Sequence, residues 1–172
     1  MKLWLPLIGF LVLVALAIWG LAKPADKTIH SAMVGRPLPA FKLAPMVPTK
    51  PGVSSADFKD GKPRLLNVFA SWCVPCAAEA PQLARLKAAG ATIEAVAIRD
   101  KTADIQDFLA RYGDPFAAVG SDPESEVQLA IGSSGVPETF VIDGKGRIVL
   151  QHIGDIREED LGEILAALEK AK

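Results

Sequence analysis

Both cysteines of the chain lie in one short segment, Trp72–Cys76, at a point where a strand pattern gives way to a helix pattern. The largely apolar residues 65–70 predict a buried strand, and residues 77–89, rich in alanine and leucine, predict a helix. Cys73 is therefore expected at a helix N-terminus, where free N–H groups and the helix dipole stabilise a thiolate and lower the pKa of the thiol. Cys76 lies one turn further on, faces inward and is positioned to resolve a mixed disulfide.

Length, charge and cysteine count narrow the classes of protein that this chain can belong to. Its 172 residues suffice for one domain of ordinary size and a short extra segment. A net charge of -1 without a block rich in lysine and arginine gives no reason to expect a nucleic-acid partner. Two cysteines are too few for a disulfide scaffold. A closed zinc site needs four ligands, and the two histidines, His30 and His152, lie in other segments.

The N-terminal residues predict export from the cytoplasm. Residues 3–22 carry no charge and have the length of a membrane-spanning helix. We expect residues 1–23 to be an uncleaved membrane anchor and residues 24–32 a polar tether. The domain, residues 33–172, is expected outside the cytoplasm. A cleaved signal peptide is the alternative, since Gly20 and Ala22 are small residues at the spacing a signal peptidase uses.

Hydrophobic periodicity and turn residues predict the element order β-α-β-α-β-α-β-β-α for the domain. The expected strands are residues 65–70, 92–98, 116–119, 138–142 and 147–152. The expected helices are 77–89, kinked at Pro81; 102–112, capped by Thr102 or Asp104; a short helix with Asp122 as N-cap and Pro123 at its first position; and 157–170. This alternation predicts parallel strand pairs with right-handed crossovers, and the turn at 143–146 adds an antiparallel edge. The expected fold class is α/β, a mixed sheet with helices on both faces.

Several segments together resemble a known family. Trp72-Cys73-Val74-Pro75-Cys76 resembles the thioredoxin active site, and Pro81 matches the kink proline of that fold. Residues 135–144, Gly-Val-Pro-Glu-Thr-Phe-Val-Ile-Asp-Gly, are similar to a segment of the membrane-anchored cytochrome c maturation thioredoxins of the CcmG/DsbE type. Residues 34–41 and 102–119 also resemble parts of that family, and the likeness covers about residues 33–170. The Val74-Pro75 dipeptide departs from the Pro-Thr or Gly-Pro common among relatives, and this dipeptide tunes the reduction potential.

The resemblance implies a thioredoxin-like fold and suggests roles for further residues. It implies that the Val136–Pro137 peptide bond is cis and faces the cysteines, so that the backbone of Val136 can pair with an extended substrate. Glu79 and Glu138 match acidic positions near the active site, where carboxylates raise thiol pKa values or relay protons. Asn67 stands where ordinary thioredoxins carry a buried aspartate, so Glu79 is a candidate replacement.

Each of these supporting residues also has an ordinary structural interpretation. Glu79 could instead be a carboxylate on the solvated face of a helix. Asn67 could instead be a core amide whose hydrogen bonds are satisfied. The indole of Trp72 either shields the disulfide and contacts partners or packs in the core. His152 and Tyr112 are interpreted as structural.

The sequence thus predicts a periplasmic thiol:disulfide oxidoreductase, held at the inner membrane by one span, that works as a reductant without a cofactor. By resemblance its substrate is the C-x-x-C-H disulfide of apocytochrome c, or a partner maturation protein, and a membrane thiol donor re-reduces it. Cys73 attacks the target disulfide and Cys76 releases the reduced target. Three alternatives remain: a tethered thioredoxin for other exported targets such as copper-site cysteines, an oxidant of folding proteins, and a non-catalytic metal-delivery module using the C-x-x-C.

Overall fold

The computed structural model describes residue 4, residues 9–14 and residues 33–172. The chain divides into two units, Met1–His30 and Ser31–Lys172. Residues 9–14 are helical and exposed. Among the described residues, no helix combines the length and the apolar character needed to cross a membrane. Most of the predicted anchor and all of the predicted tether lie outside the described residues, so both remain predictions.

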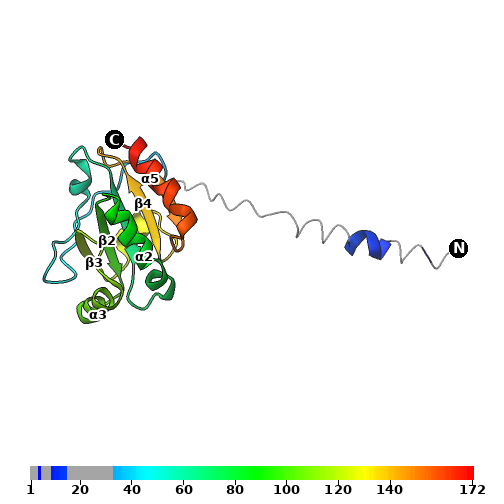
Figure 1. Ribbon diagram of the computed structural model, residues 1–172, viewed down its shortest axis with the longest axis horizontal. Coiled ribbons are helices and arrows are strands. Elements are labelled where there is room, and N and C mark those ends of the chain that lie inside the picture. The colour runs from blue at the N-terminus through cyan, green and yellow to red at the C-terminus, as the bar shows by residue number, and fades with distance from the viewer. Residues whose placement is uncertain (1–3, 5–8, 15–32) are drawn as a thin grey trace. The chain divides into compact units, whose positions relative to one another are not determined.

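The second unit is built on a mixed sheet of five strands in the order β3-β2-β1-β4-β5 (Figure 1). β1, β2 and β3 are parallel, and β4 is antiparallel to both of its neighbours, β1 and β5. The strands are β1 Arg64–Phe69, β2 Ile93–Ile98, β3 Ala118–Asp122, β4 Glu138–Ile142 and β5 Ile148–Ile153. The central strand β1 therefore delivers the cysteine segment, which follows it directly, to the middle of one sheet edge.

Helices connect and cover these strands. α2 (Val74–Ala88) follows the cysteine segment and packs against both α3 (Thr102–Tyr112) and α5 (Leu161–Lys170). In Figure 1, α2 and α5 cross in front of the strands. The remaining elements are α4 (Glu126–Ala130) and two 3-10 turns, η1 (Ser55–Lys59) and η2 (Glu158–Asp160). The thioredoxin-like arrangement predicted from the resemblance is thus confirmed for the described domain.

The direction of β4 corrects the predicted topology. Strand–helix alternation predicted a parallel fourth strand, with an antiparallel edge only after the turn at 143–146. β4 instead runs antiparallel to β1. The helix before it, α4, has five residues, which at about 1.5 Å per residue is too short to return the chain along the sheet. β4 therefore begins at the same end of the sheet where β3 ended and runs in the opposite direction to β1.

The helix starts and caps also differ from the predictions, and α2 begins at Val74, three residues before the predicted start. α3 has Lys101 at its N-cap position without a side-chain hydrogen bond, so neither Thr102 nor Asp104 is the cap. α4 begins at Glu126 with Ser125 as N-cap, whereas Asp122 ends β3. The carboxylate of Asp122 still accepts the N–H of Gln128 at 2.9 Å. It therefore satisfies a backbone donor in the first turn of α4, although Asp122 lies outside that helix. The last helix begins at Leu161 because the residues before it form the 3-10 turn η2.

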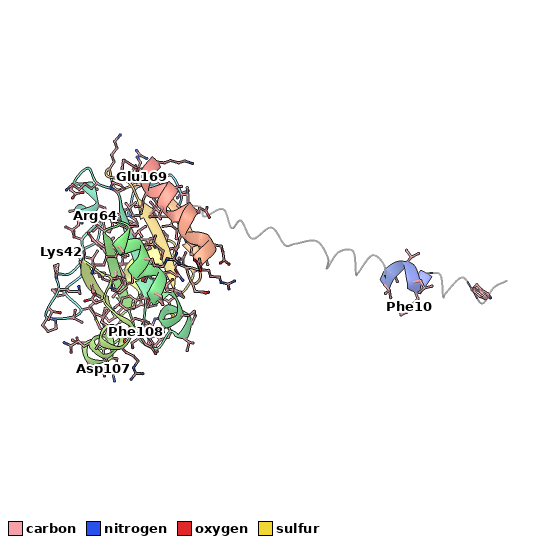
Figure 2. All side chains as sticks on the ribbon, in the orientation of Figure 1. Phe10, Lys42, Arg64, Asp107, Phe108 and Glu169 are labelled. Carbon is pink, nitrogen blue, oxygen red and sulfur yellow. A yellow bond between two sulfur atoms is a disulfide. The ribbon has the colours of Figure 1, made fainter. Side chains whose placement is uncertain are left out.

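The core lies between the sheet and the helices, and the side chains that fill it are drawn in Figure 2. Phe69, at the end of β1, packs against Phe108 of α3 and Phe116, with ring centroids 5.6 and 4.9 Å away. Phe108 is buried on the inner side of α3, while its neighbour Asp107 is exposed. The aromatic cluster supports the end of β1 from which the cysteine segment leaves.

Candidate active site

The two cysteines form a disulfide at the start of α2. Cys73 is the N-cap residue, and its sulfur accepts the N–H of Cys76 at 3.1 Å. Pro75 lies in the first helical turn, where a missing N–H costs no helical hydrogen bond. Cys73 is 5% and Cys76 2% exposed, while Val74 and Pro75 between them lie on the surface. A thiolate on Cys73 is therefore stabilised by the free N–H groups of the helix and is the more accessible of the two.

The Val136–Pro137 peptide bond is cis, as the resemblance predicted. Val68 of β1 pairs with Glu138 of β4 in antiparallel register, so Pro137 is next to Phe69 at the end of β1. The cysteine segment leaves β1 from this same end. Pro137 is buried and Val136 half-buried. The register thus brings the proline loop to the sheet edge that carries the disulfide.

Glu79 is a buried acid in the second turn of α2, so the interpretation as a solvated helix carboxylate is wrong: it is 1% exposed. One carboxyl oxygen accepts the backbone N–H of Ile156, and the other accepts the side-chain amide of Asn67, each at 3.0 Å. Burial raises the pKa of Glu79 to about 7, against the lowering effect of these two hydrogen bonds. Glu79 therefore changes its protonation state near neutral pH.

Asn67 links Glu79 to the proline strand. Its amide nitrogen donates to Glu79 and, at 2.9 Å, to the hydroxyl of Thr139 on β4. Its side-chain oxygen is buried without a hydrogen-bond partner. Asn67, Cys76 and Glu79 line the same small cavity of about 10 Å³. Asn67 therefore connects the buried acid that shares a cavity with Cys76 to the strand that follows Pro137.

Glu138 does not belong to this network. Successive strand residues point to opposite faces of a sheet, and Thr139 points toward Asn67 and Glu79. The carboxylate of Glu138, which is fully buried, instead contacts the loop at 133–135 and Gln151. The expectation that both acids act on the thiols is therefore corrected for Glu138, whose contacts are with the loop that leads to Pro137.

Trp72 is 57% exposed, so the core-packing alternative is wrong. Its indole N–H donates to the backbone oxygen of Arg99 at 3.3 Å. The carboxylate of Asp100 accepts both the backbone N–H and the hydroxyl of Ser71, at 2.5 and 2.8 Å. The turn after β2 therefore holds the two residues that precede Cys73 and leaves the indole available to a partner.

Sequence reasoning missed Ser71, Arg99 and Asp100, although a signal for them was present. Ser71 directly follows one predicted strand, and Arg99 and Asp100 directly follow the next one. The two strands are neighbours in the parallel part of the sheet. The carboxyl ends of parallel neighbours lie at one edge, so residues that follow them meet. Arg99 also has a left-handed backbone, with φ of 47°, which the sequence does not reveal.

Comparison with known proteins agrees with this geometry. The chain matches the Redoxin family over residues 33–168. It is 37% identical over 157 residues to the thiol:disulfide interchange protein HelX of Rhodobacter capsulatus, and the alignment covers 91% of this chain and 89% of HelX. The chain belongs to the DsbE/HelX family of thiol:disulfide interchange proteins.

Further members of the DsbE family support the assignment. DsbE of Escherichia coli strain K12 is 38% identical over 160 residues, covering 90% of this chain and 85% of that protein. The crystal structure of a DsbE of Chlorobium tepidum has a TM-score of 0.65 at 33% identity and covers 78% of this chain and 94% of that one. This DsbE-family chain is a protein thiol:disulfide oxidoreductase.

The stability of the DsbE-family domain is expected to fall as Glu79 loses its proton. The pKa of Glu79 is raised by burial from 4.5 to about 7, so the folded protein binds this proton more tightly than the unfolded chain. The stabilisation is complete below pH 4.5 and is lost as the pH rises through about 7, a change of about 3 kcal/mol. The measurement is the free energy of unfolding in urea near pH 5 and near pH 8.

Glu79→Gln is the comparison that isolates this effect. Burial also raises the pKa of Glu94 to about 7, so the wild-type protein loses stability from two acids over the same pH range. The variant keeps the contribution of Glu94 and should lose less stability between the two pH values. The same pH dependence in both proteins would contradict the assignment to Glu79.

Proposed function

We propose that this protein is a reductant in cytochrome c maturation. Its target would be the disulfide of the C-x-x-C-H segment of apocytochrome c, or a disulfide of a partner maturation protein. The observation that carries the chemistry is the buried Glu79, which shares a cavity with Cys76 and changes protonation near neutral pH. The resemblance of residues 135–144 to the cytochrome c maturation thioredoxins supports the choice of target.

The reaction uses the two thiols in sequence. The Cys73 thiolate attacks one sulfur of the target disulfide, and the other target sulfur leaves as a thiolate. Cys76 then loses its proton toward Glu79 and attacks the sulfur of Cys73, which releases the second target thiolate. Two electrons pass to the target, the Cys73–Cys76 disulfide forms, and no cofactor is needed.

The oxidised protein must be reduced again before another turnover. We propose that a membrane thiol donor supplies these two electrons. Residues 1–23 would anchor the protein in the inner membrane, with the domain in the periplasm, which is the placement favoured by the uncharged residues 3–22. Trp72, Pro75 and the backbone of Val136 would form the surface that receives the target and the donor in turn.

The reduction potential of the Cys73–Cys76 pair tests the direction of electron flow. A reductant is expected to have a potential below about -180 mV, more reducing than protein disulfide isomerase. The measurement is the equilibrium of the pair with glutathione buffers, followed by mass spectrometry of the alkylated protein. A variant with both cysteines replaced by serine gives the baseline. A potential near that of DsbA, about -120 mV, would assign the protein to the oxidants.

A further inference from the structure

Gln151 of β5 joins the two ends of the loop that leads to Pro137. Its amide nitrogen donates to a carboxylate oxygen of Glu138, at the end of the loop, and to the backbone oxygen of Gly132, at its start, at 3.2 Å. Both partners are acceptors, so the orientation of the amide is determined by its contacts. Glu138 and Gln151 form a diagonal pair on one face of the antiparallel strands β4 and β5.

The second carboxylate oxygen of Glu138 accepts hydrogen bonds from the loop itself. It accepts the Ser133 hydroxyl and the Ser134 N–H, each at 2.8 Å. The Ser134 hydroxyl and the Gly135 N–H are further donors, at 3.3 and 3.4 Å. Glu138 is fully buried, and among residues 33–172 it forms no ion pair with a lysine, arginine or histidine. Amide and hydroxyl donors alone therefore hold this carboxylate.

We propose that Gln151 and Glu138 are positioning residues that fix the loop at 132–135 and thereby the backbone of Val136 for a peptide substrate. This inference rests on the proposed function, in which the substrate backbone pairs with Val136. Neither residue touches the reacting sulfurs. They affect the binding of an extended peptide substrate, because a loop held at both ends presents its peptide groups in one arrangement.

A positioning role and a purely structural role predict different kinetics. A disulfide-containing peptide needs the loop, whereas bis(2-hydroxyethyl) disulfide has no peptide group that could pair with it. Loss of positioning therefore raises KM for the peptide and leaves the reaction with bis(2-hydroxyethyl) disulfide unchanged. General destabilisation of the domain reduces both reactions together.

The most direct test is Gln151→Glu, which places a second carboxylate against Glu138. Near pH 8 the two charges repel, and KM for an oxidised C-x-x-C-H peptide is expected to rise about tenfold over wild type. Near pH 5 the carboxyl added at position 151 takes up a proton and can donate to the carboxylate of Glu138 as the amide did, so the ratio to wild type should fall toward one. The rate with bis(2-hydroxyethyl) disulfide should equal that of wild type at both pH values.

Two further variants separate charge from lost donors. Gln151→Leu removes both hydrogen bonds without adding charge and should raise the peptide KM at both pH values. Gln106→Glu adds the same charge to an exposed position of α3 and should leave the peptide KM unchanged. An unchanged peptide KM in both Gln151 variants, or an equal loss with bis(2-hydroxyethyl) disulfide, would overturn the proposal.

Amide hydrogen exchange tests the loop without any substrate. The N–H groups of Ser134 and Gly135 donate to Glu138 in the wild-type protein. In Gln151→Glu near pH 8 they should exchange about tenfold faster than in wild type. Unchanged exchange would overturn the proposal. Failure of the wild-type protein to reduce the C-x-x-C-H peptide would instead contradict the proposed function, and the exchange rates would still decide the role of Gln151.

Discussion

Replacing Cys76 with alanine is expected to abolish catalytic turnover and to trap substrates on Cys73 as mixed disulfides. Cys73 remains at the N-cap of α2 and on the more accessible side of the pair, so the first attack proceeds. The thiol that would release the target is gone, so the mixed disulfide persists. The measurement is non-reducing electrophoresis of the full chain from its native host, followed by mass spectrometry of the trapped partner.

The converse variant controls for the order of the two thiols. Cys73→Ala keeps Cys76, which is 2% exposed, and should trap little. Trapping through Cys76 instead would reverse the assignment of the two roles. An apocytochrome c or a maturation protein as the trapped partner supports the proposed target. A protein whose cysteines bind copper would contradict that target and leave the exchange chemistry unchanged.

Replacing Glu79 with glutamine is expected to slow the release step by about 10²-fold at neutral pH, within the range for general acid–base catalysis. Glutamine has the same shape, and its oxygen can still accept the N–H of Ile156. Once the side-chain amide of Asn67 turns by 180°, its oxygen can accept both the new amide N–H and the hydroxyl of Thr139, which face its nitrogen in the wild-type protein. The substitution therefore removes the proton acceptor while retaining the packing.

Stopped-flow reduction of a peptide disulfide across pH 5 to 9 measures this effect. The wild-type rate should show an inflection near pH 7, where Glu79 titrates, and the variant should lack it. Glu163→Gln, at an exposed position of α5, is the matched control and should keep the wild-type profile. A pH profile of Glu79→Gln that matches wild type would remove Glu79 from the mechanism.

Local patterns in the sequence predicted the parts of this protein that depend on neighbouring residues. The cysteine pair at a strand–helix junction predicted that Cys73 lies at a helix N-terminus, and the structure shows it at the N-cap position of α2. Alternating and helical periodicity placed all five strands, with β3 displaced by two residues at its start. Asp143-Gly144 predicted the turn between β4 and β5. These signals act over a few residues, so no tertiary information was needed.

Contacts between distant segments decided the rest. The direction of β4 depends on the length of α4, and the separation of Glu79 from Glu138 depends on which face of the sheet each residue meets. Burial raises the pKa of Glu79, and the two groups that hold its carboxyl lie 12 and 77 residues away in the sequence. Charge, burial and hydrogen-bond partners are properties of the packed chain. The sequence therefore determined that thiol chemistry occurs at Cys73 and Cys76, and only the tertiary structure decided which acid shares a cavity with Cys76.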